Sequence, residues 1–217
     1  AQWPVVLSDI LEKHNNNINV LLNNAGVGSK GPVFELTEED FDKTFNINVK
    51  GTLWGMQAII SYFKQQGVGH IINVSSCLGR TPLAEYYGSY NASKHALNSL
   101  TANARQSLVN EGYGGIVVSS FHPGLVATDF GLHNGTTDNR LLPDPQPVEE
   151  VATRIINQIL EGKRVIENEK QRVLTTPNAA FTDGVFPEEN AILYDTYSRD
   201  EYKPRTVSYF SANDMGL

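Results

Sequence analysis

The sequence predicts an α/β fold in which helices cover both faces of a parallel sheet, and two observations support this. Three short runs rich in β-branched residues, at 18–22, 70–76 and 115–121, alternate with stretches of helical periodicity, which is the pattern of βαβ units. Each run is almost continuously apolar at its centre, as in strands covered on both faces. We therefore expect three buried central strands in a doubly wound parallel sheet.

Three helices are expected between and after these strands. Thr37 and the acidic residues behind it form a capping signal, and apolar residues at three- and four-residue spacing then predict one long amphipathic helix up to Phe63. A second helix is expected over 92–108, where small residues permit close helix approach. A third is expected over 148–160, after a proline-rich stretch. Beyond residue 165 the pattern weakens, apart from one expected strand at 172–175.

Bulk composition narrows the class of protein. A chain of 217 residues fits a single domain, here taken as 1–217. The net charge of −7 argues against nucleic acid as a partner. Cys77 is the only cysteine, so a reducing compartment is expected, with the thiol read as a small buried hydrophobe. The sequence has neither a long apolar run nor metal-ligand spacing of histidines. We therefore expect a cytoplasmic protein with no metal and no membrane contact.

Tyr90 and Lys94 are the first candidates for chemistry. They are four residues apart at the start of the second long helix, so their side chains share one face. A nearby ammonium favours the tyrosinate form and lowers the pKa of a phenol, which would suit Tyr90 to proton transfer. Without further motifs, an ordinary amphipathic Tyr and a solvated Lys on a helix surface would be the preferred interpretation of this pair.

Further candidates follow the ends of the expected strands. Ser76 ends the second run, and ligands of open α/β sheets lie outside the carboxyl ends of the strands. A hydroxyl at that position can hold a carbonyl oxygen beside Tyr90, although Ser76 could also simply cap the next turn. Small, turn-forming residues follow the first run at 23–26 and the third at 123–128, where backbone can approach a flat ligand.

Five motifs in order now give a specific resemblance: NNAG at 23–26, NVKG at 48–51, NVSS at 73–76, YNASK at 90–94 and PGLVAT at 123–128. Over 19–128 the chain resembles the short-chain dehydrogenase/reductase family, which has a Rossmann-like fold. The resemblance implies four catalytic residues: Tyr90 as general acid/base, Lys94 as the group that lowers its pKa, Ser76 as the residue that orients the substrate oxygen, and Asn48 as the holder of a water. It also implies the cofactor-binding residues, which are Asn24, Ala25, Gly26, Lys50, Tyr90, Lys94, Pro123, Gly124, Val126 and Thr128.

The chain departs from the family pattern in two respects. Ser76 precedes Tyr90 by fourteen positions, one more than is usual, so Ser75 and Cys77 remain alternatives for its role. No glycine-rich turn that would cradle a pyrophosphate precedes Asn23. We therefore expect that the N-terminal βα units are missing, on the order of 60 residues. Those units carry the residue that separates NAD from NADP, so both cofactors stay open, with NADP as our first choice.

The function expected from the resemblance is hydride transfer between NAD(P)(H) and a small alcohol or carbonyl substrate. The alternative is a catalytically inactive, truncated relative that acts through protein contacts. A homo-oligomer, dimer or tetramer, is expected through the two long helices. Residues 129–217 would hold a variable substrate lid and the C-terminal region, with apolar surface from Phe130, Leu132, Phe181 and Phe186.

Overall fold

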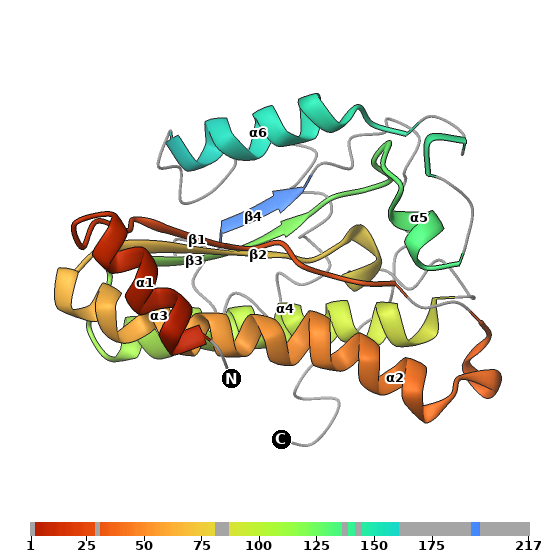
Figure 1. Cartoon of the computed structure of the whole chain (residues 1–217), viewed down its shortest axis with the longest axis horizontal. Helices are drawn as coiled ribbons and strands as arrows, with labels where there is room; N and C mark the ends of the chain where they lie inside the picture. The colour runs from red at the N-terminus through yellow and green to blue at the C-terminus, as the bar shows by residue number, and fades with distance from the viewer. Residues whose placement is uncertain are drawn as a thin grey trace, which may run out of the picture.

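The sheet of this protein is parallel throughout and lies between two layers of helices. The computed structural model describes residues 3–28, 31–80, 87–135, 139–141, 145–160 and 192–195. Four strands follow one another in the order β1 (Val20–Asn23), β2 (Gly69–Val74), β3 (Ile116–His122) and β4 (Ile192–Asp195), and every neighbouring pair is parallel. Helices α3 and α4 lie on one side of the sheet and α6 on the other (Figure 1). The expected α/β fold, a doubly wound parallel sheet, is confirmed.

The burial of the strands differs from the sequence prediction at one end of the sheet. β2 and β3 are buried at their centres, where Ile71, Ile72 and Val118 are almost inaccessible. β1 instead lies at an edge of this four-stranded sheet, with Val20 38% and Leu22 45% exposed. The prediction of three buried central strands is therefore wrong for β1. The sequence pattern shows which segments are apolar, but it does not give the order of the strands in the sheet. Strand β4 was not predicted, and the strand expected at 172–175 lies outside the described residues.

The first long helical stretch is divided by a π-helical turn. Thr37 caps α2 (Glu38–Phe45), its hydroxyl accepting the backbone N–H of Asp40 at 3.1 Å. The π-helical segment η2 (Asn46–Gly51) follows and continues into α3 (Thr52–Gln66). One regular helix was expected here. The wider turn disrupts the regular spacing, and it falls where the buried Asn48 lies.

The remaining helices complete the two layers. These are α1 (Trp3–Lys13), α4 (Gly88–Asn110), α5 (Phe130–His133) and α6 (Val148–Leu160), with short 3₁₀ turns η1 (Val33–Glu35), η3 (Cys77–Gly79) and η4 (Asn139–Leu141). The predicted bounds of α6 are confirmed, whereas α1 was not predicted. Among the described residues, no helix combines the length and apolar character required to cross a bilayer.

Two apolar cores, one on each side of the sheet, hold the layers together. The first joins the sheet to α3 and α4 and contains Met56, Ile59, Phe63, Ile71, Leu108, Ile116 and Val118. The second joins it to α6 and contains Ile72, Phe121, Val151 and Ile155. Neighbouring residues of β2 therefore point into different cores, as the alternation of side chains along a strand requires.

Candidate active site

The candidate site lies where the carboxyl ends of β1, β2 and β3 meet. Parallel strands end at the same edge of a sheet, so the segments after Asn23, Val74 and His122 lie near one another. Backbone hydrogen bonds continue past the strand ends: Ser75 N–H donates to Phe121 O at 2.7 Å, and Cys77 N–H donates to Pro123 O at 3.0 Å. The segment that carries Ser76 is thereby fixed against the segment after β3.

The structure brings Tyr90, Lys94 and Ser76 together at this edge. Tyr90 lies in the first turn of α4, 8% exposed, and its phenol shares a side-chain hydrogen bond with Ser76. The Lys94 ammonium is 5.6 Å from the centroid of the Tyr90 ring and donates to Val74 O at 2.8 Å. The two alternatives to Ser76 make other contacts. The Ser75 hydroxyl donates to Lys94 O at 3.4 Å, and the Cys77 sulfur lies 4.0 Å from the Ser76 hydroxyl.

Burial shifts the pKa values of both ionisable groups away from their charged forms. Burial raises the pKa of Tyr90 to about 12, and the Ser76 hydrogen bond only partly opposes this. Burial also lowers the pKa of Lys94 to about 8. The expected lowering of the Tyr90 pKa is therefore wrong for the chain alone, because loss of solvent outweighs the hydrogen bond with Ser76. Tyr90 is a neutral phenol at neutral pH, and thus a proton donor, while Lys94 is mostly charged.

Asn48 connects α4 to the loop after β1. Its amide oxygen accepts Val27 N–H at 2.8 Å, and its NH₂ donates to Val27 O at 2.8 Å and to the Ser93 hydroxyl at 3.0 Å. A Cβ on Gly26 would lie 3.4 Å from both Asn48 Oδ1 and Lys94 Nζ. Asn48 and Lys94 thus flank Gly26, and the loop passes directly over the buried ammonium.

The other candidates for cofactor binding occupy the surrounding loops. Asn24 and Ala25 are exposed and Gly26 half-buried at the end of β1, and Lys50 is exposed in η2. Pro123, Gly124 and Thr128 are half-buried after β3, and the Thr128 hydroxyl accepts Phe130 N–H at 3.3 Å. Val126 packs against the core under α6, so part of its surface serves the fold. Phe181 and Phe186 lie outside the described residues.

Two buried polar groups contribute to the site without having been predicted. His122 contacts Ser76 O through Nδ1 at 3.2 Å and the Ser120 hydroxyl through Nε2 at 2.9 Å. Burial, with a contribution from the charge of Arg80, holds the pKa of His122 well below its usual range, so this imidazole is neutral. The sequence offered only a signal of position, since His122 directly precedes the PGLVAT motif.

The second unpredicted group is a buried amide chain. Asn23 Nδ2 donates to Asn73 Oδ1 at 2.8 Å, and Asn73 Nδ2 donates to the Thr101 hydroxyl at 2.9 Å. These bonds join the ends of β1 and β2 to α4, the helix that carries Tyr90. The first asparagine of NNAG and that of NVSS are therefore structural here.

The residues at this edge fit a nicotinamide cofactor better than a metal ion. The exposed loop at Asn24 and Ala25 presents small residues and backbone, and the buried ammonium of Lys94 beside Gly26 suits the hydroxyls of a sugar. Within the described part of the chain, no group of three or more His, Cys, Asp or Glu side chains could hold a metal.

Comparison with known proteins gives the family of the chain. The family model described as short chain dehydrogenase matches residues 1–138. The chain belongs to the short-chain dehydrogenase family. Its relatives include a diacetyl reductase [(S)-acetoin forming] of Staphylococcus epidermidis, 42% identical over 114 residues, which are 52% of this chain and 43% of the relative. A 3-beta-hydroxysteroid dehydrogenase of Comamonas testosteroni is 34% identical over 149 residues, which are 67% of this chain and 57% of the relative. The chain thus spans about half the length of these curated relatives.

Solved structures of short-chain dehydrogenases share the fold. A short-chain dehydrogenase from Sphingobium yanoikuyae in complex with NADPH superposes with a TM-score of 0.67 at 20% identity, covering 92% of this chain and 76% of the other. A short chain dehydrogenase/reductase from Burkholderia phymatum in complex with NAD gives a TM-score of 0.59 at 27% identity, covering 88% and 66%. The first likeness supports the Rossmann-like fold, and the two structures bind different nicotinamide cofactors.

Proposed function

We propose that this protein is an NAD(P)-dependent oxidoreductase that transfers hydride between the cofactor and a small alcohol or carbonyl compound. The observation that carries the proposal is the contact of the Ser76 hydroxyl with the Tyr90 phenol, with the Lys94 ammonium beside the same ring. A proton donor, a second hydroxyl and a cation therefore converge at one sheet edge, which is what a carbonyl oxygen needs while negative charge develops on it.

The roles of the residues follow from their protonation states. When bound, the nicotinamide supplies the hydride for reduction and accepts it in oxidation. Tyr90, neutral because its pKa is raised, donates its proton to the carbonyl oxygen and completes the alcohol. Ser76 orients that oxygen, and the positive charge of Lys94 stabilises the tyrosinate that Tyr90 becomes. We assign Asn48 to holding the loop above Lys94 and the water beside it.

The loops after β1 and β3 supply the cofactor contacts in this proposal. Exposed backbone and small side chains at Asn24, Ala25 and Gly26 receive the ribose region, with Lys50 as a further contact. On the opposite side, the segment after β3 would touch the nicotinamide ring and its carboxamide, through Pro123, Gly124, Val126 and Thr128. Relatives of known structure bind NADP or NAD, so both remain candidates, with NADP tested first.

Replacement of Tyr90 by phenylalanine tests the proposal. Oxidation of NADPH, and separately of NADH, is followed in the presence of diacetyl, and binding of each cofactor is titrated by its fluorescence. We expect Tyr90→Phe to lose about 10²- to 10⁴-fold in turnover while cofactor affinity stays within a few-fold. Tyr87→Phe is the matched control, because Tyr87 packs edge-on against Tyr90 at 6.4 Å and loses the same hydroxyl. Substantial turnover by Tyr90→Phe would refute the proposed role.

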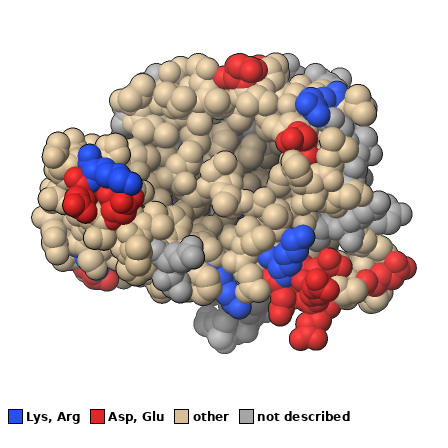
Figure 2. Space-filling model, in the orientation of Figure 1, with Lys and Arg blue, Asp and Glu red and all other residues tan. Residues whose placement is uncertain are grey.

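One observation favours a second candidate, a non-catalytic relative that acts through protein contacts. Among the described strands, β1 lies at an edge of the sheet and exposes Val20 and Leu22, and exposed strand edges are templates for pairing with another chain. Figure 2 shows this face of the molecule as a hollow surface of mainly uncharged side chains, with acidic groups gathered toward α2, whose first turn holds Glu38, Glu39 and Asp40. Micromolar binding of NADPH by the chain would argue against this candidate.

We also propose that copies of the chain associate as a dimer or tetramer through the helices of the α3 and α4 layer. Phe41 on α2 and Trp54 on α3 are each 43% exposed, which is high for large apolar side chains. Sedimentation velocity should show an assembled species that Trp54→Glu shifts toward the monomer. A wild-type chain that sediments as a monomer at micromolar concentration would contradict the proposal.

A further inference from the structure

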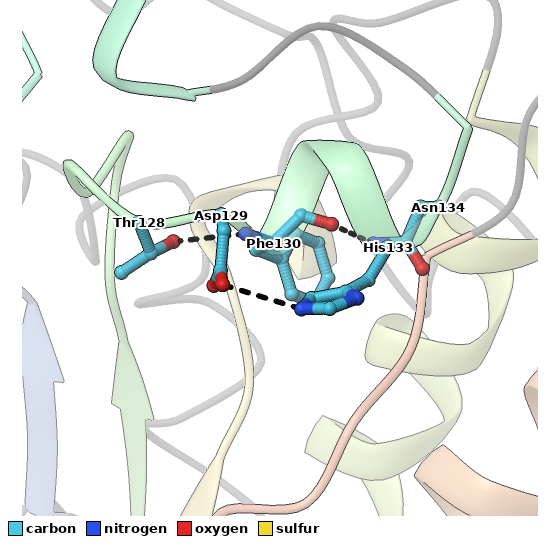
Figure 3. Close-up of polar contacts among 5 residues, drawn as sticks. All are labelled: Thr128, Asp129, Phe130, His133 and Asn134. Carbon is cyan, nitrogen blue, oxygen red and sulfur yellow. Dashed lines mark hydrogen bonds and ion pairs between the residues drawn. The ribbon is translucent and has the colours of Figure 1, made fainter.

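The side chain of Asn134 ties the short helix α5 to the loop after β1. The Asn134 amide oxygen accepts Gly28 N–H at 2.7 Å. Its NH₂ donates to Phe130 O at 2.5 Å, the contact that Figure 3 shows. One amide therefore caps the carboxyl end of α5 and also holds the loop that follows β1. Gly28 and Asn134 are 106 positions apart in sequence, so only the tertiary fold brings them together.

Gly28 provides the space that this contact needs. A Cβ at residue 28 would lie 2.9 Å from both Cγ and Nδ2 of Asn134, closer than real Cβ contacts. Gly28 does not have a positive φ, so its backbone conformation is open to alanine. Glycine is therefore needed at residue 28 because it has no Cβ to collide with Asn134, and not because of its backbone conformation.

The contact closes a ring around the candidate site. Strand β2 lies between β1 and β3, so an arm that reaches from the segment after β3 to the loop after β1 passes the end of β2, which leads to Ser76. At ~4.8 Å per strand, the arm covers about 10 Å. The far side of the ring is Asn48, which binds Val27 and, on α4, Ser93.

Phe130 connects the arm to the reacting groups. Its ring lies 5.8 Å from that of Tyr90 at an interplanar angle of 57°, a favourable aromatic contact. Because Asn134 binds the carbonyl of Phe130 itself, the position of this ring depends on the same amide that holds Gly28. An apolar wall is thereby set beside the phenol of Tyr90.

We propose that Asn134 and Gly28 form a latch that holds Phe130 against Tyr90 and limits the site to small carbonyl compounds. The inference rests on the proposed function for its substrate class. Asn134 is a positioning residue in this scheme, since it acts on the substrate only through Phe130. A bulky substituent on the carbonyl compound must open the latch, whereas a methyl group need not.

The latch itself is tested without any activity. Hydrogen exchange of the Gly28 amide, measured by NMR on the full chain, should be slow in the wild type and about two- to tenfold faster in Asn134→Ala, the range expected for one hydrogen bond. His133→Ala is the matched control, because it removes only an exposed contact with Asp129 on the same helix. Equal Gly28 exchange in wild type and Asn134→Ala would overturn the proposal, as would an equal rise in the control.

Substrate selectivity tests what the latch does. The ratio of kcat/KM for diacetyl to that for 1-phenylpropane-1,2-dione, which replaces one methyl by a ring, should fall about two- to tenfold in Asn134→Ala and stay unchanged in His133→Ala. An unchanged ratio with faster Gly28 exchange would overturn the role in selectivity. Failure of the proposed function would give a different result. Turnover by Tyr90→Phe would refute the proposed role of Tyr90, but the exchange rate of the Gly28 amide would not change.

A double-mutant cycle separates the latch from a general loss of stability. Gly28→Ala should displace Asn134 and speed exchange of the residue 28 amide relative to its intrinsic rate, as Asn134→Ala does. Combining the two should add little, because Asn134→Ala already removes Cγ and Nδ2, the two atoms that would lie 2.9 Å from a Cβ at residue 28. Fully additive effects would mean that the two residues act independently and would overturn the proposal.

Discussion

The buried ammonium of Lys94 makes a prediction about stability that opposes its proposed role in catalysis. Lys94 is 3% exposed, and burial lowers its pKa from 10.5 to about 8. At ~1.4 kcal/mol per pKa unit, keeping the charged form in the folded chain costs about 3 kcal/mol at neutral pH. Lys94→Met removes that cost and loses the hydrogen bond from the charged ammonium to Val74 O, worth about 2 kcal/mol. We expect the variant to be about 1 kcal/mol more stable at pH 7 and to lose turnover.

The free energy of unfolding of the wild type should change with pH in a definite direction. Between pH 8 and 10.5 the unfolded chain keeps a proton on Lys94 that the folded chain has released, so wild-type stability rises with pH in this window. From pH 7 to pH 9.5 the gain is about 2 kcal/mol. Lys94→Met has no such group, and its unfolding free energy should lack this rise.

Urea unfolding at pH 7, 8, 9 and 9.5, followed by circular dichroism, measures both effects. The comparison uses the difference between wild type and Lys94→Met, so that the titration of other groups cancels. Parallel pH profiles for the two proteins would refute the reasoning, because they would mean that Lys94 binds its proton equally well in the folded and unfolded chains. A variant that is less stable than the wild type at pH 7 would show that the bond to Val74 O outweighs the burial of charge.

Three other predictions concern the fold. Gly115→Ala should destabilise the chain by more than about 2 kcal/mol in urea unfolding, because a Cβ there would lie 2.2 Å from the backbone oxygen of Gly67; Gly114→Ala, with open space around it, should change stability by less than about 0.5 kcal/mol. Burial lowers the pKa of His70 to about 4, so the free energy of unfolding should fall as pH drops from 6.5 toward 4. His70→Gln should make this fall smaller in acid titrations, and an equal fall in wild type and variant would contradict the prediction. Thr37→Ala removes the cap of α2 and should cost about 1 kcal/mol, read as a lower Tm; an unchanged Tm would show that the cap is not needed.

The sequence was most informative about the reactive side chains that lie close to the ends of predicted strands. Ser76, Tyr90 and Lys94 were predicted to meet because parallel strands share a carboxyl edge and i, i+4 residues share a helix face, and the structure places them in contact. The resemblance gave Ser76, with Ser75 and Cys77 as alternatives, and the hydrogen bond between the side chains of Ser76 and Tyr90 favours Ser76. The roles of these residues remain proposals.

Other features depend on neighbours that are distant in sequence. The exposed face of β1 follows from the order of strands, which the apolar pattern of residues 18–22 does not encode. The π-helical turn around Asn48 depends on its partners Val27 and Ser93, from two other segments. Helix α1 was missed, and none of its residues is fully buried.

The sequence by itself determined the class of fold and the chemical types at the sheet edge, because periodicity and the spacing of residues along one strand or helix are local properties. Only the tertiary structure decided the protonation of Tyr90 and the closure of α5 by Asn134. The pKa of the phenol depends on how much solvent the whole fold removes, and that loss outweighed the hydrogen bond with Ser76. The latch needs an amide and a glycine from opposite sides of β2 to come within 2.7 Å, a distance that the folded sheet alone sets.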